Sequence, residues 1–166
     1  MSDRLPVERA LRWLQDLNFP TQIRESDWLF PTIETVHVLA LVLVVGSIMT
    51  VDLRLLGVAN KERPFSQVAA EMLPWTWRAF GIAALAGFLM FSSKALTYYG
   101  DIPFRIKILC LVLAGINMML FHSIGTRRLP EWDDGKPPWP ARFAGGTSLL
   151  LWILIVASGR WVGFTT

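Results

Sequence analysis

Two histidines lie within strongly apolar stretches of this chain, and histidine is a common ligand of metals and of haem iron. His37 follows Glu34 by three residues, so both side chains share one face of a helix. A carboxylate in that position can orient the imidazole ring of a ligating histidine. His122 lies in another apolar stretch. Both histidines are therefore candidate metal or haem ligands, although two separated histidines do not form a spaced metal motif.

Basic residues are expected near the same membrane face as Glu34 and His37. Basic side chains at such a site can hold haem propionates or a quinone oxygen. The candidates are Lys94, Arg105, Lys107 and Arg160. The alternative is that these long side chains snorkel to lipid headgroups and have no other role.

A second polar group is expected near the opposite face. Asp52 follows Glu34 by about five helical turns and so lies on the same side of its helix. Arg54 follows closely, and Asn117 lies on another apolar stretch between the two faces. Ionisable residues inside a bilayer are costly, so Asp52 is a functional candidate, whereas Arg54 suits an interfacial position.

Helical depth argues against one haem held by both histidines of a single molecule. At the helical rise of about 1.5 Å per residue, His37 lies about 10 Å from its membrane face and His122 about 24 Å from the same face. The mismatch is roughly 14 Å, whereas two axial ligands of one haem lie at similar depth. A haem on each histidine with another ligand, a haem shared between subunits and no haem at all remain as alternatives.

Four apolar stretches carry these residues, at about 29–57, 75–99, 103–126 and 141–164. Each approaches the ~20 residues that cross ~30 Å of hydrocarbon as a helix. The chain of 166 residues is 53% hydrophobic and only 17% charged. Continuously apolar stretches exclude the alternating strands of a membrane barrel. The sequence predicts one integral membrane domain over residues 1–166, an all-α bundle of four transmembrane helices in a lipid bilayer.

Residues 1–28 predict a short amphipathic helix followed by a linker. Apolar residues recur at helical spacing after Pro6, which suits a helix start. Asn18-Phe19-Pro20 suits a helix end. We expect this helix to lie in the membrane interface, and packing on the end of the bundle is the alternative.

Aromatic residues mark both membrane faces, as expected of a spanning bundle. Face A carries both termini and is marked by Trp28, Tyr98, Tyr99 and Trp161, and face B is marked by Trp75, Trp77, Trp132 and Trp139. Basic residues are equally numerous on the two faces. If Lys94, Arg105 and Lys107 belong to a binding site and are discounted, face B is cytoplasmic and the termini are periplasmic.

Several other classes of function are excluded. The net charge is +3, but the basic residues flank apolar stretches and form no patch interleaved with aromatic residues, which argues against nucleic-acid binding. Cys110 is the one cysteine and lies in an apolar stretch, which predicts a buried, inert thiol. Nucleotide-binding loops and a Ser-His-Asp arrangement are missing, so we assign no catalytic residue and leave open whether the protein is an enzyme.

Several short motifs together resemble an uncharacterised bacterial family of small four-helix membrane proteins, a domain of unknown function. They are Glu34-Thr-Val-His37, Gly46-xxxxx-Asp52-Leu-Arg54-Leu-Leu-Gly57, Pro74-Trp-Thr-Trp77, Tyr98-Tyr-Gly100, Phe104-Arg-Ile-Lys107, Asn117-xxxx-His122 and Gly159-Arg-Trp161. The resemblance implies a multi-pass protein of the bacterial inner membrane. Histidines in apolar helices also give a looser similarity to copper-resistance membrane proteins and b-type cytochromes.

Three functions fit these residues. The first is a haem- or quinone-linked electron-transfer component with a polar site near one face. The second is a proton-coupled transporter or channel for a small solute or metal ion that uses Glu34, His37 and Asp52. The third is an accessory subunit of a homo-oligomer or of a larger membrane complex, in which small residues serve helix packing.

Overall fold

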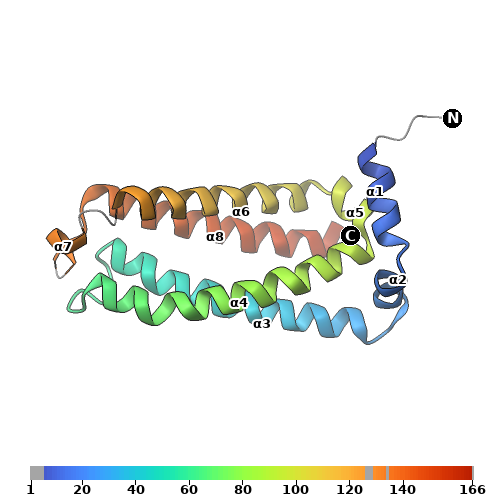
Figure 1. The fold of residues 1–166 in the computed structure, drawn as a ribbon, viewed down its shortest axis with the longest axis horizontal. Coiled ribbons are helices and arrows are strands. Elements are labelled where there is room, and N and C mark those ends of the chain that lie inside the picture. Colours follow the sequence, from blue (N-terminus) through green and yellow to red (C-terminus); the bar gives the residue numbers. More distant parts are fainter. Residues whose placement is uncertain (1–5, 126–128, 134, 166) are drawn as a thin grey trace.

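Four long helices form the body of the molecule. The computed structural model describes residues 6–125, 129–133 and 135–165. The long helices α3 (Leu29–Leu55), α4 (Phe65–Ser93), α6 (Ile102–Leu120) and α8 (Trp139–Thr165) lie side by side (Figure 1). Shorter elements complete the fold: α1 (Pro6–Gln15), α2 (Asn18–Glu25), α5 (Ala95–Gly100), α7 (Leu129–Trp132) and a π-helical turn, Phe121–Gly125, that continues α6.

Three helical stretches are long and apolar enough to cross a membrane. They are Leu29–Leu55, Ile102–Ser123 and Trp139–Thr165, with mean hydropathies of 2.2, 1.9 and 1.6. Their outer surfaces expose large apolar side chains such as Leu39 and Ile153, which suits a lipid environment. α4 is equally long, but Arg78 and several hydroxyl side chains lower its hydropathy, and it is not among the three.

The long helices form two antiparallel pairs, α3 with α4 and α6 with α8 (Figure 1). The pairs meet along α3 and α8, whereas α4 and α6 have few close backbone contacts and meet through side chains, such as the rings of Phe91 and Phe104, which stack at 5.4 Å. Around the bundle, three sides are therefore packed and the α4–α6 side is loosely packed.

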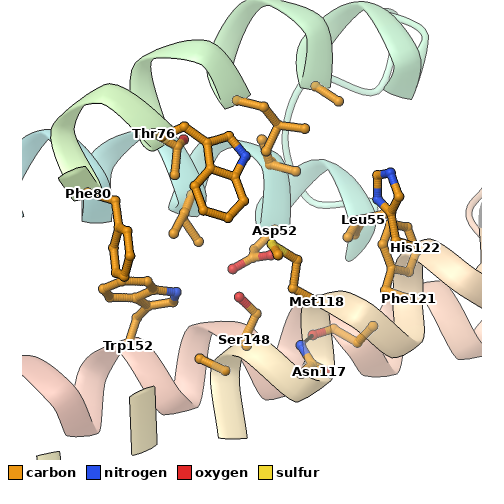
Figure 2. A pocket seen from close by; sticks show the side chains of 18 of the residues that line it. Asp52, Leu55, Thr76, Phe80, Asn117, Met118, Phe121, His122, Ser148 and Trp152 are labelled. Carbon is orange, nitrogen blue, oxygen red and sulfur yellow. Dashed lines mark hydrogen bonds between the residues drawn. The ribbon is translucent and has the colours of Figure 1, made fainter. Parts of the chain in front are cut away.

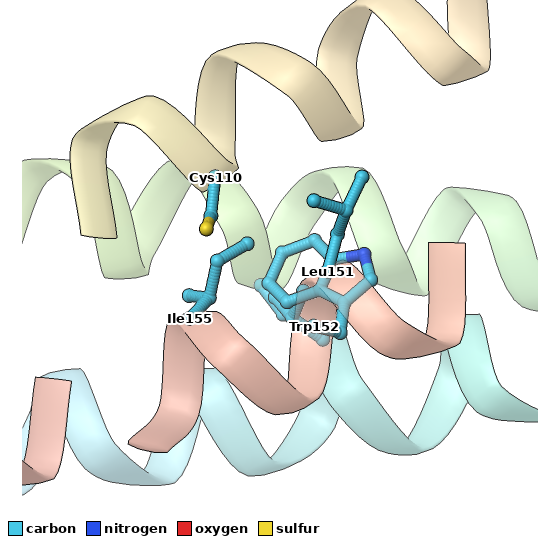
Figure 3. Close-up of a cluster of buried hydrophobic side chains, with 6 residues drawn as sticks. Cys110, Leu151, Trp152 and Ile155 are labelled. Carbon is cyan, nitrogen blue, oxygen red and sulfur yellow. The ribbon is translucent and has the colours of Figure 1, made fainter. Parts of the chain in front are cut away.

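An apolar core fills the middle of the bundle. It contains Val44, Ala79, Cys110, Leu151, Trp152 and Ile155. Figure 3 shows Cys110 pointing from α6 towards Ile155 of α8. The buried thiol that the sequence predicts is confirmed. A second cluster lies nearer face B and contains Val51, Leu55, Phe65, Ala69, Trp132 and Ala141.

The N-terminal segment forms two helices, where the sequence predicted one helix and a linker. α1 begins at Pro6 as expected, but α2 begins at Asn18, where we expected a helix to end. Pro20 lies in the first turn of α2, where a proline breaks no helical hydrogen bond. Ile23 is fully buried, and the two helices pack on the end of the bundle against α3, α4 and α5.

The second long helix differs from its predicted range of 75–99 at both ends. α4 begins at Phe65, ten residues before the predicted start, and continues through Pro74. α4 ends at Ser93, and Lys94 breaks the helix before α5. The hydroxyl of Ser93 donates to the carbonyl of Met90, and such local bonds compete with helical ones.

The N-terminal helices satisfy the polar groups that this break exposes. Arg24 of α2 donates a hydrogen bond to the carbonyl oxygen of Ser93, at 3.1 Å. The side-chain oxygen of Gln15 in α1 accepts one from the backbone N–H of Leu96, at 3.3 Å. Helix ends leave such groups without partners inside the helix, so α1 and α2 act as caps for α4 and α5.

Arg54 ties the two face-B connections together. It is only 1% exposed, and its guanidinium donates to the carbonyl oxygens of Arg63 (2.8 Å), Asp133 (2.9 Å) and Gly135 (3.4 Å). Arg54 lies in the last turn of α3, but its side chain is enclosed by the connections and does not extend outwards to lipid headgroups. A buried guanidinium needs several acceptors, and backbone carbonyls of the two connections supply them.

Asp133 holds the start of α4. Its side-chain oxygens accept hydrogen bonds from the backbone N–H of Ser66 (2.7 Å) and from the Ser66 hydroxyl (2.6 Å). Trp132 packs beside it against Phe65, with ring centroids 5.4 Å apart. The connection between the predicted stretches 103–126 and 141–164 thus contains α7 and packs on the bundle, although 126–128 and 134 lie outside the described residues.

Candidate functional site

A cavity of about 870 Å³ lies between the four long helices in the face-B half of the bundle (Figure 2). Its wall is mostly apolar and includes five aromatic rings. They belong to Phe65, Trp77, Phe80, Phe121 and Trp152. Small-molecule sites have this character, with volumes of about 300–1,000 Å³ and a few polar groups in an apolar wall.

Asp52 places a carboxylate in the cavity wall. The residue is 4% exposed, and its Oδ2 atom has no hydrogen-bond partner among the described residues. The hydroxyl of Ser148 on α8 points towards this carboxylate (Figure 2) and interacts with it. A buried carboxylate oxygen without a partner costs free energy, so this oxygen is a candidate acceptor for a donor on a ligand or a water molecule.

A glycine contact brings α8 close enough for Ser148 to reach Asp52. A Cβ atom on Gly145 would lie 2.9 Å from the Leu55 Cβ and 3.0 Å from the Asp52 carbonyl oxygen. Such distances exclude any larger residue without movement of α3 or α8. Gly145 lies one turn before Ser148 on the same helix face, so the close contact also aligns the hydroxyl.

Hydroxyl and amide groups elsewhere in the wall are already paired. The Thr76 hydroxyl donates to the Ser47 hydroxyl oxygen at 2.7 Å, which joins α4 to α3. The Asn117 amide donates to the Ala144 carbonyl at 3.0 Å, which joins α6 to α8. These bonds fix the wall. Asp52 therefore has the one fully buried acceptor without a partner in the described part of the cavity wall.

His37 lies between α3 and α4, outside the cavity. Its Nδ1 is 2.7 Å from the carbonyl oxygen of Ala83, so this nitrogen carries the proton and donates. Nε2 is then the nitrogen that can bind a metal. A Cβ on Gly87 would lie 3.0 Å from the His37 Cε1, so glycine makes room for the ring. Lys107 lies near enough for its charge to act on His37.

The other residues predicted for the face-A site do not join His37 and Lys107. Glu34 is exposed and forms no ion pair with another described residue. Lys94 lies over the Phe30 ring, at 5.7 Å from the centroid. Arg105 and Arg160 are exposed and lie over the rings of Tyr99 and Phe164, respectively, at 5.2 and 5.1 Å. Each of these three basic residues is thus engaged with an aromatic ring of a helix end.

The family match covers the same helices that build the cavity. Residues 29–165 match a family of unknown function (DUF6644). The chain belongs to this family. No curated protein and no solved structure matches it. The match runs from the start of α3 to the end of α8, so the bundle of this DUF6644 protein is the shared part.

The two histidines of this DUF6644 protein lie in different environments. His122 is in the π-helical turn and lines the cavity, whereas His37 is not part of its wall. Within the described ranges, no three His, Cys, Asp or Glu side chains gather as a metal site. Each histidine therefore has to be considered separately as a ligand.

Sequence reasoning missed Ser148 and the aromatic wall. A serine within an apolar helix usually bonds to its own backbone, so Ser148 gave no signal by itself. Its spacing of one turn from Gly145, a residue that permits close helix approach, was the available signal. The aromatic residues come from different helices, and which of them converge depends on helix rotation.

Proposed function

We propose that this DUF6644 protein is a quinone-linked electron-transfer component that binds the quinone headgroup in the Asp52 cavity. The observation that carries the proposal is the unpaired Oδ2 of Asp52, buried in an otherwise apolar and aromatic wall. A quinol hydroxyl supplies the donor that this oxygen requires. When the oxidised form is bound, the Ser148 hydroxyl can rotate away from Asp52 and donate its single proton to a quinone carbonyl.

The aromatic wall suits a quinone ring. Flat rings pack on Trp152 and Phe80, which lie together on one side of Asp52 (Figure 2). Aromatic pairs of this kind contribute about 0.5–1.5 kcal/mol each beyond the area they bury. The wall thus provides affinity for the ring, and the carboxylate distinguishes the reduced form from the oxidised form.

The membrane placement forms part of this proposal. We propose that α4 is the fourth span, because it runs antiparallel to α3 over the same length and its Lys94 end lies beside the start of α3. Four spans place both ends of the described chain at face A. Of the basic residues that the sequence assigns to the two faces, seven remain at face A and eight at face B once Lys107 is set aside with His37. We therefore propose a cytoplasmic face B and periplasmic termini in a bacterial inner membrane.

Binding to the purified protein in nanodiscs tests the quinone site. Quinol is titrated under anaerobic conditions and followed by quenching of tryptophan fluorescence, to which Trp77 and Trp152 in the wall contribute. We expect Asp52→Asn to weaken quinol binding about tenfold or more, because a hydrogen bond to a charged group contributes about 1.5–3 kcal/mol. Glu34→Gln removes an exposed carboxylate and is the control. Equal affinities in wild type, Asp52→Asn and Asp52→Leu would contradict the proposal.

Haem b is the second cofactor that we propose to test, at His37. The hydrogen bond from Nδ1 to Ala83 fixes the tautomer that leaves Nε2 for iron, as in many metal-ligating histidines. The protein is purified from cells supplied with haem, and its spectrum is recorded before and after dithionite. Bands that sharpen on reduction and disappear in His37→Ala support this site. A featureless spectrum of the wild type excludes it, and His122→Ala is the matched control.

Transport of a lipophilic cation is the alternative that one observation favours. No described cationic side chain forms an ion pair with Asp52, and aromatic rings surround it. Carboxylates and aromatic faces both attract organic cations. Uptake of a fluorescent lipophilic cation into proteoliposomes, driven by a proton gradient and lost in Asp52→Asn, would favour transport over quinone binding.

A further inference from the structure

The exposed part of the cavity wall belongs to only one side of the bundle. Trp77 and Phe80 of α4 are 54% and 36% exposed, and Met118 of α6 is 42% exposed. The residues that line the cavity from α3 and α8, in contrast, are buried or half-buried. The cavity mouth is therefore between α4 and α6, where the two helices have few close backbone contacts.

Side chains narrow both ends of the cavity, and the exposed lining residues Ser66 and His122 lie at its face-B end. Towards face B, the Phe65 ring packs edge-on against Phe121 at 5.8 Å and against Trp132 at 5.4 Å. Arg54 and Asp133 hold the segment that carries Trp132. Towards face A, the apolar core that contains Val44, Cys110 and Ile155 fills the bundle. The exposed apolar part of the cavity wall therefore lies on the α4–α6 side.

The mouth lies at the depth of the hydrocarbon. Met118 belongs to Ile102–Ser123, one of the stretches that can cross a membrane. It lies about 24 Å along the helix from Ile102, at a rise of 1.5 Å per residue. If α6 spans the membrane, this depth falls within the ~30 Å of hydrocarbon, and the exposed part of a molecule in this mouth meets lipid chains. Its exposed part therefore has to be apolar.

We infer that the ligand of this cavity is a long-tailed lipid that enters from the bilayer, with its headgroup at Asp52 and its isoprenoid or alkyl tail between α4 and α6. This inference rests on the proposed function for the headgroup. It adds the class of the ligand: a molecule with a tail that resides in the membrane. A water-soluble ligand is thereby excluded. It also adds the residues that contact the tail, which are Trp77, Phe80, Gly115 and Met118.

Gly115 is the position at which the mouth can be narrowed. It lines the cavity, and a Cβ atom there would meet nothing within 4 Å. Gly115→Phe therefore adds a ring in open space at the mouth. Ile116 is the next residue on the same helix, is 46% exposed and does not line the cavity. Ile116→Phe is the matched control.

The test compares one quinone headgroup with and without a decaprenyl or decyl tail, in nanodiscs. We expect the tail to strengthen binding to wild type at least tenfold. Gly115→Phe should cancel that gain and change the affinity for the tail-free headgroup less than twofold, while Ile116→Phe leaves both unchanged. Equal binding of tailed and tail-free forms, or an equal loss of both in Gly115→Phe, overturns the inference and leaves the headgroup site intact. Binding of neither form to wild type overturns the proposed function and this inference with it.

A labelling experiment keeps the inference testable if Gly115→Phe does not fold. Gly115→Cys should react with a membrane-soluble maleimide, because the mouth is open to lipid. The tailed quinone should slow the reaction at least fivefold, and the tail-free quinone should not. Equal protection by both forms, or none by either, contradicts a tail between α4 and α6.

Discussion

The Asp133 side chain caps the start of α4, because the residue before the helix cannot. Pro64 precedes Phe65 and has no side-chain acceptor, so the carboxylate of Asp133 accepts from the Ser66 N–H instead. Partial burial alone would raise the pKa of Asp133. The hydrogen bonds from Ser66 and the charge of Arg54 outweigh it and lower the pKa of Asp133 below its usual value.

This shift predicts acid sensitivity at the start of α4. A lowered pKa in the folded state stabilises the protein above the unfolded pKa of about 4, and this stability is lost as pH falls through the folded value. Asp133→Asn should lower the free energy of unfolding at pH 7 by about 1 kcal/mol, because the neutral amide forms weaker hydrogen bonds than the carboxylate. The difference from wild type should shrink below about pH 4. Thermal unfolding in detergent between pH 3 and pH 7 measures it, and a constant difference would contradict the assignment.

Arg54 predicts a larger loss of stability. Its planar fork donates to three carbonyl oxygens from two connections, and a lysine ammonium does not match that geometry. Arg54→Lys should lower the free energy of unfolding by about 2 kcal/mol, because buried carbonyls lose partners. Arg142→Lys, at an exposed position on α8, is the control. Equal protease resistance of the 56–64 connection in the two variants would count against this role.

At the residue scale, prediction from the sequence was best where chemistry is unusual. Asp52 was a candidate because a carboxylate in an apolar helix is costly wherever it points. Whether Glu34 or His37 faces the interior could not be predicted, because both lie on one helix face at different depths. The structure buries His37 and exposes Glu34. Ser148 acquires a role only through a contact from another helix.

At the scale of the helices, the α3–α8 contact at Gly145 controls the site. Gly145→Ala should force α3 and α8 apart and lower stability by about 1–3 kcal/mol, because the new methyl group overlaps the Leu55 Cβ. Gly146→Ala is the control, since its Cβ would lie 3.6 Å from Leu56, an ordinary contact. Thermal unfolding of the two variants in detergent checks this. Equal stability would show that the helices are not tightly apposed there.

Helix type was easier to predict than helix ends. Apolar stretches predict long helices because lipid leaves backbone groups no other partner. The starts and breaks depend on partners from elsewhere in the chain. α4 begins ten residues before its predicted start at 75 because Asp133 caps it at Phe65. It breaks at Lys94, where Arg24 and Gln15 bind the freed groups.

At the scale of the whole molecule, the number of spans is the quantity to measure. Four spans place Pro6 and Thr165 on one side of the membrane, whereas three spans place them on opposite sides. In the structure, α1 and the end of α8 lie at the same end of the bundle (Figure 1). Reporters that are active in only one compartment, fused to either terminus, should therefore agree. Opposite signals would show that α4 does not cross.

The order in which helices pack could not be predicted from the sequence. All four apolar stretches expose enough apolar surface to pair with any other, so the pairing depends on small residues such as Gly87 and Gly145. Each of these two meets one particular neighbour, His37 or Leu55. The helical bundle could be predicted from the apolar stretches. The position of the cavity could not, because it lies where the close contacts at Gly87 and Gly145 leave α4 and α6 apart.

The loosely packed α4–α6 side makes the protein mechanically sensitive to the bilayer. The two helix pairs have their closest backbone contacts along α3 and α8, and on the other side they meet through side chains such as Phe91 and Phe104. Widening of the mouth therefore requires these side chains to separate. The lateral pressure of surrounding lipid chains acts against the separation of α4 and α6. Tightly packed, ordered lipids therefore oppose widening of the mouth between α4 and α6 and slow the entry of large molecules. Fluid lipids oppose this widening less. The lipid composition of the membrane therefore affects how easily the mouth between α4 and α6 widens.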